Sequence, residues 1–299
     1  CNRRQAGGKK NTGYKETYLS LERFKQWFDE EFVSRLYSIQ ICGNYGDAMT
    51  NPELIDILRY IIKLNPDIVF TMNSNASGRN EKFWSELGEI FSKNFKSLLT
   101  FSVDGLEDTN HIYRRGAKWD KIMIAMKSFI NAGGPAAWEY LVFKHNQHQV
   151  EEAKKLADEM GFKEFRIRKT ARFTYSPDGP MKWRVQDKHK NIEYYLQPPT
   201  DKNYYNAEQD KWTEITKTDE GKNDYLNNTK ISCLYKNKFR RIYVNAYADV
   251  FPCCYISNDV YPGKNSIVKD SQQKIFDRYQ KHFNSCLLYT SDAADDRLS

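Results

Sequence analysis

Hydrophobic and polar positions follow two different periods between residues 38 and 169. Short runs rich in Val, Ile, Phe and Leu predict strands at 38–41, 67–72, 98–104, 137–143 and 164–168. Between them, apolar residues recur every three or four positions, which predicts helices over 51–62, 81–93, 118–131 and 147–160. We expect the first of these helices to begin with Asn51 as its N-cap and Pro52 in the first helical position. Gly133 and Gly161 stand where helix C-caps are expected.

This alternation of strands and helices, joined by short turns, predicts parallel βαβ units and an α/β sheet, open or barrel-like. The alternation stops after residue 170. The stretch 171–231 is rich in Lys, Asp, Asn, Tyr and Pro and is interpreted as a linker with one short helix. A strand pattern returns at 241–245 and 249–251.

Composition narrows the class of protein. Of 299 residues, 40% are hydrophobic and 28% are charged, so the chain can bury a core and is not disordered throughout. The net charge of +7 is spread along the sequence, which argues against a nucleic-acid-binding stripe. No run approaches the roughly 18 apolar residues of a membrane helix. We therefore expect a soluble cytoplasmic protein without a membrane partner.

Small and polar residues stand at the end of each predicted strand. In parallel α/β folds ligands bind beyond the carboxyl ends of the strands, so these residues are the candidate binding site. The later strands contribute His145, Asn146, Arg166 and Arg168. The first three strands contribute the candidate ligand-binding residues Gly46, Asp47, Ala48, Asn73, Asn75, Ser102 and Asp104.

Each of these residues also has an ordinary structural interpretation. Asp47 would serve equally well as the cap of the helix that follows it, and Asp104 would form an Asx turn into a glycine. The pair Arg114 and Arg115 is typical of a solvated helix start, and Cys42 of a small buried hydrophobe. The histidines lack metal-binding spacing, so none is assigned as a metal ligand, and no catalytic residue is assigned.

The order of these motifs resembles that of radical S-adenosylmethionine enzymes. The run Gly46-Asp47-Ala48 stands where that family has its glycine-glycine-glutamate-proline motif, with Asp for Glu and Ala for Pro. The segments 101–106 and 113–116 are similar to the family's fourth-strand region and the start of its next helix. Cys1-Asn-Arg-Arg resembles the surroundings of the third cysteine of its C-x3-C-x2-C loop, whose first two cysteines would lie upstream.

The resemblance implies a partial (β/α)6 barrel and a 4Fe–4S cluster with Cys1 among its ligands. It implies that the cluster binds S-adenosylmethionine and, with one electron from a donor, cleaves it to a 5′-deoxyadenosyl radical that abstracts hydrogen from substrate. Carbonyls around 46–48 would take the cofactor's ammonium group. The side chains of Asn73, Asn75, Ser102 and Asp104 would meet ribose hydroxyls or the substrate.

The C-terminal cysteines form a second motif. A hairpin that ends in Cys253 and Cys254, with Cys233 upstream, would bring three sulfurs to one metal centre. This segment resembles the opening of the SPASM or twitch auxiliary cluster domains, although Ala248 replaces their usual glycine. Such enzymes often modify peptides or proteins, so the resemblance implies an auxiliary 4Fe–4S cluster and a peptide substrate. Zinc is the alternative occupant, since thiolates bind it too.

The predicted organisation is a core over 1–170, a linker over 171–231, an auxiliary domain over 232–285 and a tail over 286–299. The tail (CLLYTSDAADDRLS) resembles the translated end of a transposon used to prepare sequencing libraries, and we expect it to be non-native. A natural polar tail is the alternative. We expect a fragment that lacks residues at both ends. The alternative function is a non-catalytic zinc- or iron–sulfur-binding interaction module on an α/β scaffold.

Overall fold

The computed structural model describes residues 17–42, 46–170, 172–173, 176, 178–179, 181–215, 217–228, 242–245 and 247–251. These residues form two compact units. The first contains the described residues between 20 and 209, and the second contains 17–19 and those from 210 onward.

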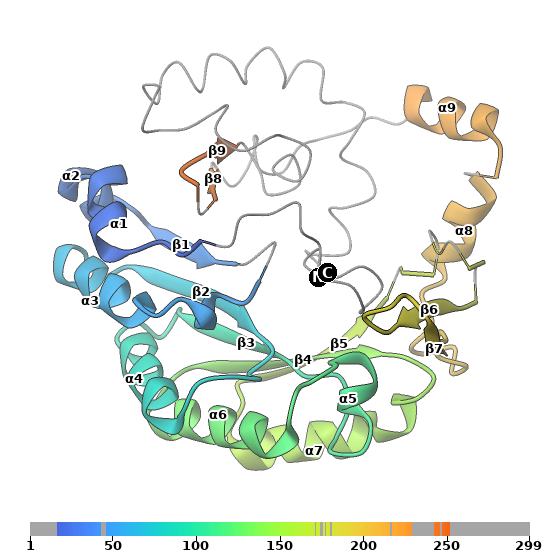
Figure 1. The fold of residues 1–299 in the computed structure, drawn as a ribbon, viewed down its shortest axis with the longest axis horizontal. Coiled ribbons are helices and arrows are strands. Elements are labelled where there is room, and N and C mark those ends of the chain that lie inside the picture. The colour runs from blue at the N-terminus through green and yellow to red at the C-terminus, as the bar shows by residue number, and fades with distance from the viewer. Residues whose placement is uncertain are drawn as a thin grey trace. The chain divides into compact units, whose positions relative to one another are not determined.

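A parallel five-stranded sheet forms the centre of the first unit, and its strands lie in chain order. The strands are β1 (Ser38–Ile41), β2 (Val69–Ser74), β3 (Leu98–Ser102), β4 (Ala136–Val142) and β5 (Glu164–Lys169). The helices α3 (Leu54–Leu64), α4 (Glu81–Ser92), α6 (Trp119–Asn131) and α7 (Val150–Met160) lie on one side of it (Figure 1). The predicted α/β fold with parallel βαβ units is confirmed.

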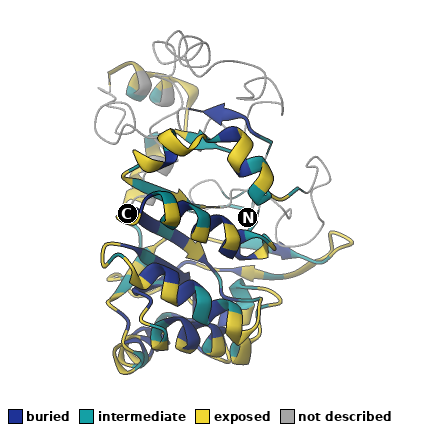
Figure 2. Ribbon diagram, turned by 90° about the vertical axis from the view of Figure 1, so that its left-hand side faces the viewer, coloured by how far each residue is buried: buried dark blue, intermediate teal, exposed yellow. Residues whose placement is uncertain are grey.

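An aromatic core joins the sheet to its helices. The ring of Phe101 on β3 lies 5.7 Å, centroid to centroid, from both Trp84 of α4 and Phe129 of α6, and all three side chains are fully buried. Phe70 and Trp138 are buried on the same side of neighbouring strands. The helices are accordingly buried toward the sheet and exposed on their outer sides (Figure 2).

The other face of the sheet is polar. Successive residues of a strand point to opposite faces, so the neighbours of these buried aromatic residues point away from the helices. Asn73 pairs in register with Thr100, and Ser102 pairs with Glu139, which in turn pairs with Arg166. Hydrogen-bonding side chains therefore line the face that lies opposite the helices.

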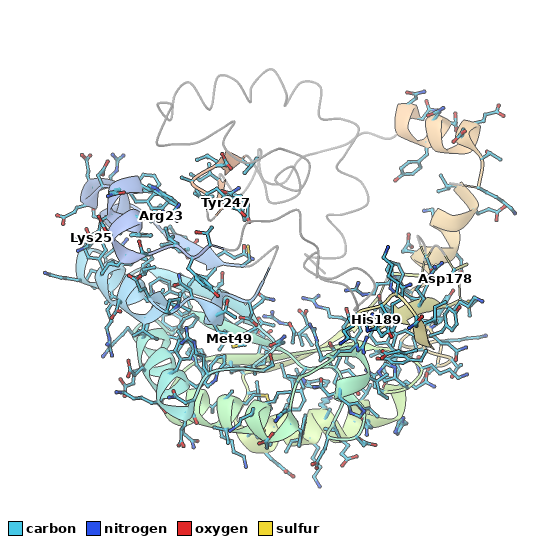
Figure 3. The ribbon with its side chains drawn as sticks, viewed as in Figure 1. Arg23, Lys25, Met49, Asp178, His189 and Tyr247 are labelled. Atoms are coloured by element: carbon cyan, nitrogen blue, oxygen red, sulfur yellow. The ribbon has the colours of Figure 1, made fainter. Side chains whose placement is uncertain are left out.

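Two short helices that the hydrophobic pattern did not predict precede the sheet. Both carry standard N-caps, since Ser20 caps α1 (Leu21–Trp27) and Asp29 caps α2 (Glu30–Ser34). On α1, the Arg23 guanidinium lies over the Trp27 ring, and the Lys25 ammonium lies 4.6 Å from the ring centroid of Tyr60 on α3 (Figure 3). The first contact lies within α1, and the second attaches α1 to α3.

The helix ends differ partly from the prediction. Gly133 and Gly161 follow α6 and α7 in the left-handed conformation, both with φ of +83°, as predicted. The prediction of Asn51 as the N-cap of α3 is wrong, because that helix begins three residues later at Leu54. The Asn51 side chain accepts a hydrogen bond from the Glu53 N–H within the preceding turn instead.

The predicted linker contains more structure than expected. Strands β6 (Trp183–Gln186) and β7 (Ile192–Leu196) form an antiparallel hairpin within the first unit. Val185 and Leu196 of the hairpin pack against Phe143 and Phe173 in a small apolar cluster. The Tyr194 hydroxyl donates a 2.6 Å hydrogen bond to the carbonyl of Ile112 in helix α5 (Asn110–Tyr113). The hairpin is thus fixed to the segment that follows β3.

The second unit contains the predicted C-terminal hairpin. Helix α8 (Glu208–Ile215) spans the boundary between the units, and α9 (Asp219–Asn228) follows it. Strands β8 (Tyr243–Val244) and β9 (Val250–Phe251) pair antiparallel across a turn in which the Asn245 carboxamide oxygen accepts two backbone hydrogen bonds. Ala248 is buried in this turn with φ of +70°, a conformation that favours glycine and costs an alanine about 1 kcal/mol. No helix in the described ranges is long and apolar enough to cross a membrane.

Candidate functional site

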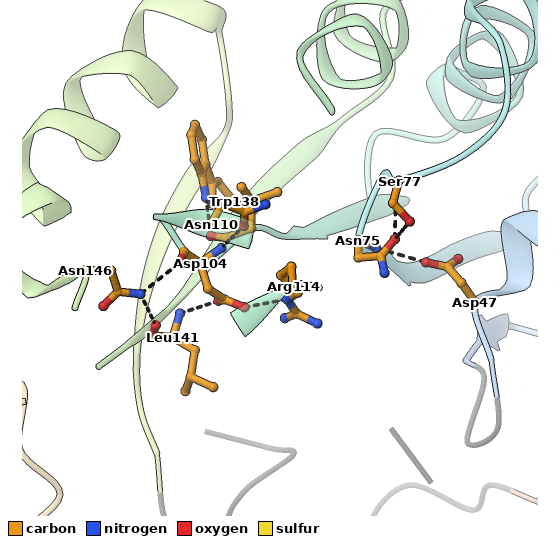
Figure 4. A network of polar contacts seen from close by, with 10 residues as sticks. Asp47, Asn75, Ser77, Asp104, Asn110, Arg114, Trp138, Leu141 and Asn146 are labelled. Atoms are coloured by element: carbon orange, nitrogen blue, oxygen red, sulfur yellow. Dashed lines mark hydrogen bonds and ion pairs between the residues drawn. The ribbon is translucent and has the colours of Figure 1, made fainter. Parts of the chain in front are cut away.

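The candidate residues lie where predicted, at the carboxyl ends of β1, β2 and β3. The turn Ala48–Thr50 follows β1, a loop from Asn75 to Asn80 follows β2, and Asp104 follows β3. We call this edge of the sheet the rim. Figure 4 shows two groups of polar contacts on it, one around Asp47 and one around Asp104.

Asp47 links the first two strand ends. One carboxylate oxygen accepts a hydrogen bond from the Met49 N–H and so caps the short turn after β1. The other oxygen accepts hydrogen bonds from the Ser74 hydroxyl (2.8 Å) and the Asn75 N–H (2.9 Å). Burial raises the pKa of Asp47 above its usual range, although these hydrogen bonds oppose the shift. Asp47 therefore caps this short turn and not the predicted helix, whose N-cap is Glu53, and its carboxylate in addition joins β1 to β2.

A second set of contacts joins the same two loops. The Arg79 side chain donates 2.6 Å hydrogen bonds to the carbonyls of Met49 and Asn51. The Asn75 carboxamide oxygen accepts hydrogen bonds from the N–H and hydroxyl of Ser77, which closes the second loop on itself. The loops after β1 and β2 are therefore held in one arrangement.

The carbonyls around 46–48 are not equally available. The Asp47 carbonyl accepts hydrogen bonds from the Thr50 N–H and hydroxyl, and the Ala48 carbonyl accepts one from the Asn51 N–H. The Gly46 carbonyl accepts no hydrogen bond from any described residue. Of the three predicted acceptors, only Gly46 presents an oxygen without a partner in the described part of the chain.

Asn73 and Ser102 present polar side chains on the face of the sheet opposite the helices. Asn73 is exposed on β2 and Ser102 is half-buried at the end of β3. Neither side chain forms a hydrogen bond with the residues that the structure describes. Both are therefore free to bind a ligand at the rim.

Asp104 is fully buried and engaged. Its carboxylate accepts hydrogen bonds from Arg114 Nε (2.5 Å) and from the Leu141 N–H on β4 (2.7 Å). Burial raises the pKa of Asp104, and the adjacent Arg114 guanidinium opposes that shift. The expected Asx turn does not form, since the Leu106 N–H donates to Thr109 and Gln149. Arg114 is likewise not a solvated helix start but the ionic partner of Asp104 (Figure 4).

Asn146 organises the same region, and sequence reasoning gave it no such role. Its carboxamide nitrogen donates to the carbonyls of Asp104 (2.9 Å) and Leu141 (3.0 Å), and its oxygen accepts from the Phe143 N–H. The Tyr140 hydroxyl donates to the Asn146 carbonyl. One fully buried side chain therefore connects the ends of β3 and β4. Its position after a strand end was visible in the sequence, but its partners were not.

Other polar residues are paired. Arg168 forms an ion pair with Glu139 (2.9 Å) and Arg166 with Glu164 (2.6 Å). Arg115 pairs with Glu193 (2.5 Å) and donates to the Gln186 carbonyl, so it attaches the hairpin to the rim and the solvated-helix interpretation is wrong for it as well.

Cysteine placement bears on metal binding. The interpretation of Cys42 as a buried residue is wrong, because it is exposed directly after β1. Within the described ranges no group of three His, Cys, Asp or Glu residues is arranged to hold a metal ion. The predicted metal ligands Cys1, Cys233, Cys253 and Cys254 lie outside the described residues, as does the tail 286–299.

No protein-family model and no curated protein sequence matches this chain. Its fold, however, is similar to that of solved radical S-adenosylmethionine enzymes. Streptococcus suis SuiB bound to its precursor peptide SuiA aligns with a TM-score of 0.54 at 13% identity, over 94% of this chain and 60% of SuiB. SuiB bound to S-adenosylmethionine gives a TM-score of 0.53 at 13% identity, over 88% of this chain and 60% of that one.

A second enzyme gives a similar result. Native anSMEcpe with bound AdoMet (S-adenosylmethionine) aligns with a TM-score of 0.55 at 14% identity, over 95% of this chain and 79% of that chain. The predicted fold class, a partial barrel of the kind found in radical S-adenosylmethionine enzymes, is confirmed. This chain spans about 60% of the length of SuiB, and what it shares with these enzymes is the fold.

Proposed function

We propose that this chain belongs to a radical S-adenosylmethionine enzyme that acts on a peptide or protein. The observation that carries the proposal is the rim itself. The loops after β1 and β2 are fixed to each other, while the Gly46 carbonyl and the Asn73 and Ser102 side chains have no partner among the described residues. A preorganised edge with unused hydrogen-bonding groups is what a small polar ligand requires.

The residues divide into two roles under this proposal. The Gly46 carbonyl would accept a hydrogen bond from the cofactor's ammonium group, and Asn73 and Ser102 would bind its hydroxyl groups. Asp47 and Asp104 would not contact the cofactor. They position the loops, because their carboxylate oxygens already accept hydrogen bonds from the protein. Ala48 and Asn75 would likewise hold the two loops in shape rather than present side chains to the ligand.

When bound, S-adenosylmethionine supplies a 5′-deoxyadenosyl radical that abstracts hydrogen from substrate, after reductive cleavage at a 4Fe–4S cluster. Cys1 is proposed as one cluster ligand. The proposal further requires an electron donor, and Cys233, Cys253 and Cys254 are proposed to hold an auxiliary centre. A peptide substrate is supported by SuiB, whose structure contains its precursor peptide, and by the shared fold.

Cofactor binding tests the rim directly. A protein that carries the upstream cysteines in addition to this chain is reconstituted anaerobically with iron and sulfide, and binding of radiolabelled S-adenosylmethionine is measured by equilibrium dialysis. The double variant Asn73→Ala/Ser102→Ala should bind at least about tenfold more weakly, as expected for the loss of two hydrogen bonds. The matched control Ser85→Ala/Asn131→Ala, which makes the same chemical changes on α4 and α6, should bind as the unchanged chain does. If the two double variants bound S-adenosylmethionine with equal affinity, the rim would not be part of the binding site.

The cysteines are tested by metal analysis and turnover. In a protein that carries the upstream cysteines, reduction should yield 5′-deoxyadenosine, and Cys1→Ala should abolish its formation. Cys233→Ala should lower the iron content by about one cluster. One equivalent of zinc at this centre, without extra iron or cofactor cleavage, would favour the non-catalytic interaction module instead.

A further inference from the structure

Two guanidinium groups share one aromatic ring at the rim. The central carbons of Arg114 and Arg172 each lie 5.2 Å from the ring centroid of Tyr113. Tyr113 ends the short helix after β3, whereas Arg172 follows β5, so the two cations come from different strand ends. Each gains from the negative face of the ring, but they repel each other unless anions offset their charge.

Only one of the two cations has a counter-ion in the described part of the chain. Arg114 uses its Nε to bind the Asp104 carboxylate. Arg172 forms no ion pair with any described carboxylate, and its Nε–H is buried without a hydrogen-bond partner. Glu139, the other nearby carboxylate, is already paired with Arg168. A buried donor on an unpaired cation is costly, and such groups usually mark the place of a ligand or an ordered water.

A second buried polar atom without a hydrogen-bond partner in the described part of the chain belongs to His145, which is part of an aromatic cluster with Phe143 and Tyr113. The His145 ring stacks on Phe143 with centroids 5.4 Å apart, and Phe143 contacts Tyr113 at 4.7 Å. The Nε2 atom of His145 is buried and has no hydrogen-bond partner among the described residues. Three orphan polar atoms occur in the described ranges, and two of them, on Arg172 and His145, belong to this cluster.

We infer that Arg172 and Arg114 at the Tyr113 ring, together with His145 on the adjoining Phe143 ring, form a subsite that binds the carboxylate of an acidic residue in the peptide substrate. The inference rests on the proposed function for its choice of a peptide. A planar guanidinium with a free N–H edge suits a carboxylate, which accepts two parallel hydrogen bonds. The His145 imidazole, which stacks on the adjoining Phe143 ring, would supply one further hydrogen bond to the ligand through Nε2.

The position of the cluster fits a substrate at the rim. Its members follow β3, β4 and β5, whereas the proposed cofactor contacts belong to β1, β2 and β3. Arg114 lies between the two groups, because its charge acts on Asp47 as well as on Asp104 (Figure 4). A ligand held by Arg172 would therefore lie beside the proposed cofactor site.

A pair of peptides that differ in one group tests the subsite. The probes are acetyl-Gly-Glu-Gly-amide and acetyl-Gly-Gln-Gly-amide, which have nearly the same shape but differ in charge. Binding to the full chain, without iron or cofactor, is measured by ligand-observed NMR. The Glu peptide should bind about tenfold more tightly than the Gln peptide. Arg172→Gln should abolish that preference, and the control Arg59→Gln, in an exposed ion pair on α3, should retain it.

Several results would overturn the inference. One is equal binding of the two peptides to the unchanged chain, and another is an undiminished preference in Arg172→Gln. The carboxylate of S-adenosylmethionine is the other group that could bind to Arg172 in the same way. If Arg172→Gln weakened S-adenosylmethionine binding tenfold but left the peptide preference intact, the subsite would belong to the cofactor. Arg172→Lys keeps the positive charge and should keep part of the preference for the Glu peptide. Partial retention in Arg172→Lys would show that the loss in Arg172→Gln comes from the missing charge and not from unfolding.

The peptide assay is independent of the proposed enzyme activity because it involves no iron, reductant or cofactor cleavage. A Glu preference that depends on Arg172 in a protein that never yields 5′-deoxyadenosine would support the subsite and reject the proposed function. The reverse result, cofactor cleavage without a peptide preference, would reject only the subsite.

Discussion

Acidic residues at the rim hold the loops in place instead of facing a ligand. Asp47 and Asp104 each accept hydrogen bonds from chain segments far away in sequence, at Asn75 and Leu141 respectively. Their residue type and their position at strand ends could be predicted from the sequence. Their partners could not, because hydrogen bonds over 28 and 37 residues depend on how the strands align.

Replacing Asp47 should weaken the rim more than replacing an exposed carboxylate. Asp47→Ala leaves the Ser74 hydroxyl and the Asn75 N–H without their acceptor, so the free energy of unfolding should fall by about 1–3 kcal/mol. Asp56→Ala, at an exposed position on α3, should change it by less than about 0.5 kcal/mol. Urea denaturation of the two variants provides the comparison, and equal losses would contradict the linking role of Asp47.

The stability of the fold should depend on pH through His145. Burial, with smaller contributions from His111 and His148, lowers the pKa of His145 from 6.5 to about 4. The unfolded chain therefore takes up the proton first, and the stabilising contribution is present above pH 6.5 and lost as the pH falls toward about 4. In urea denaturation at several pH values, His145→Asn should lose less stability over this range than the unchanged chain. His189→Asn, in an exposed turn, should follow the unchanged chain.

At the scale of elements, the local period of the sequence was a good guide to the sheet and a poor one elsewhere. All five strands of the parallel sheet lie within two residues of their predicted bounds, because buried strands and amphipathic helices carry strong patterns. The hairpin of β6 and β7 has no such pattern. It is held by Arg115 and Tyr194 through contacts with residues of another element, which a local pattern does not contain. The N-caps Ser20 and Asp29 were visible but lacked a long apolar period after them.

The turn from β3 into α5 requires glycine. Gly105 has φ of +141°, and an added Cβ would overlap the Thr109 hydroxyl and approach the Asn110 nitrogen to 2.7 Å. Gly105→Ala should therefore lower the free energy of unfolding by more than about 2 kcal/mol. Gly116 also has positive φ but has open space around it, so Gly116→Ala should cost only about 1 kcal/mol. Thermal denaturation distinguishes the two, and an equal effect would show that the close contact is relieved by small shifts.

At the scale of the whole molecule, the first unit depends on its aromatic layer between sheet and helices. Phe101 lies at the centre of that layer and is fully buried, whereas Phe95 is 76% exposed before β3. Phe101→Ala should lower the free energy of unfolding by about 3–5 kcal/mol through lost burial and a residual cavity. Phe95→Ala makes the same chemical change and should stay within about 0.5 kcal/mol. Chemical denaturation checks both, and a small loss for Phe101→Ala would mean that the layer repacks.

The hairpin turn of β6 and β7 offers a position for a spectroscopic reporter. The Asp187 carboxylate accepts hydrogen bonds from the N–H groups of His189 and Asn191, which gives the turn a defined shape, while His189 itself is exposed. The end of the hairpin next to this turn is attached to the segment after β3 through Gln186 and Tyr194. A fluorophore attached to the cysteine of His189→Cys would therefore occupy a fixed position relative to the segment after β3. Changes in its emission would report movements at the rim in real time.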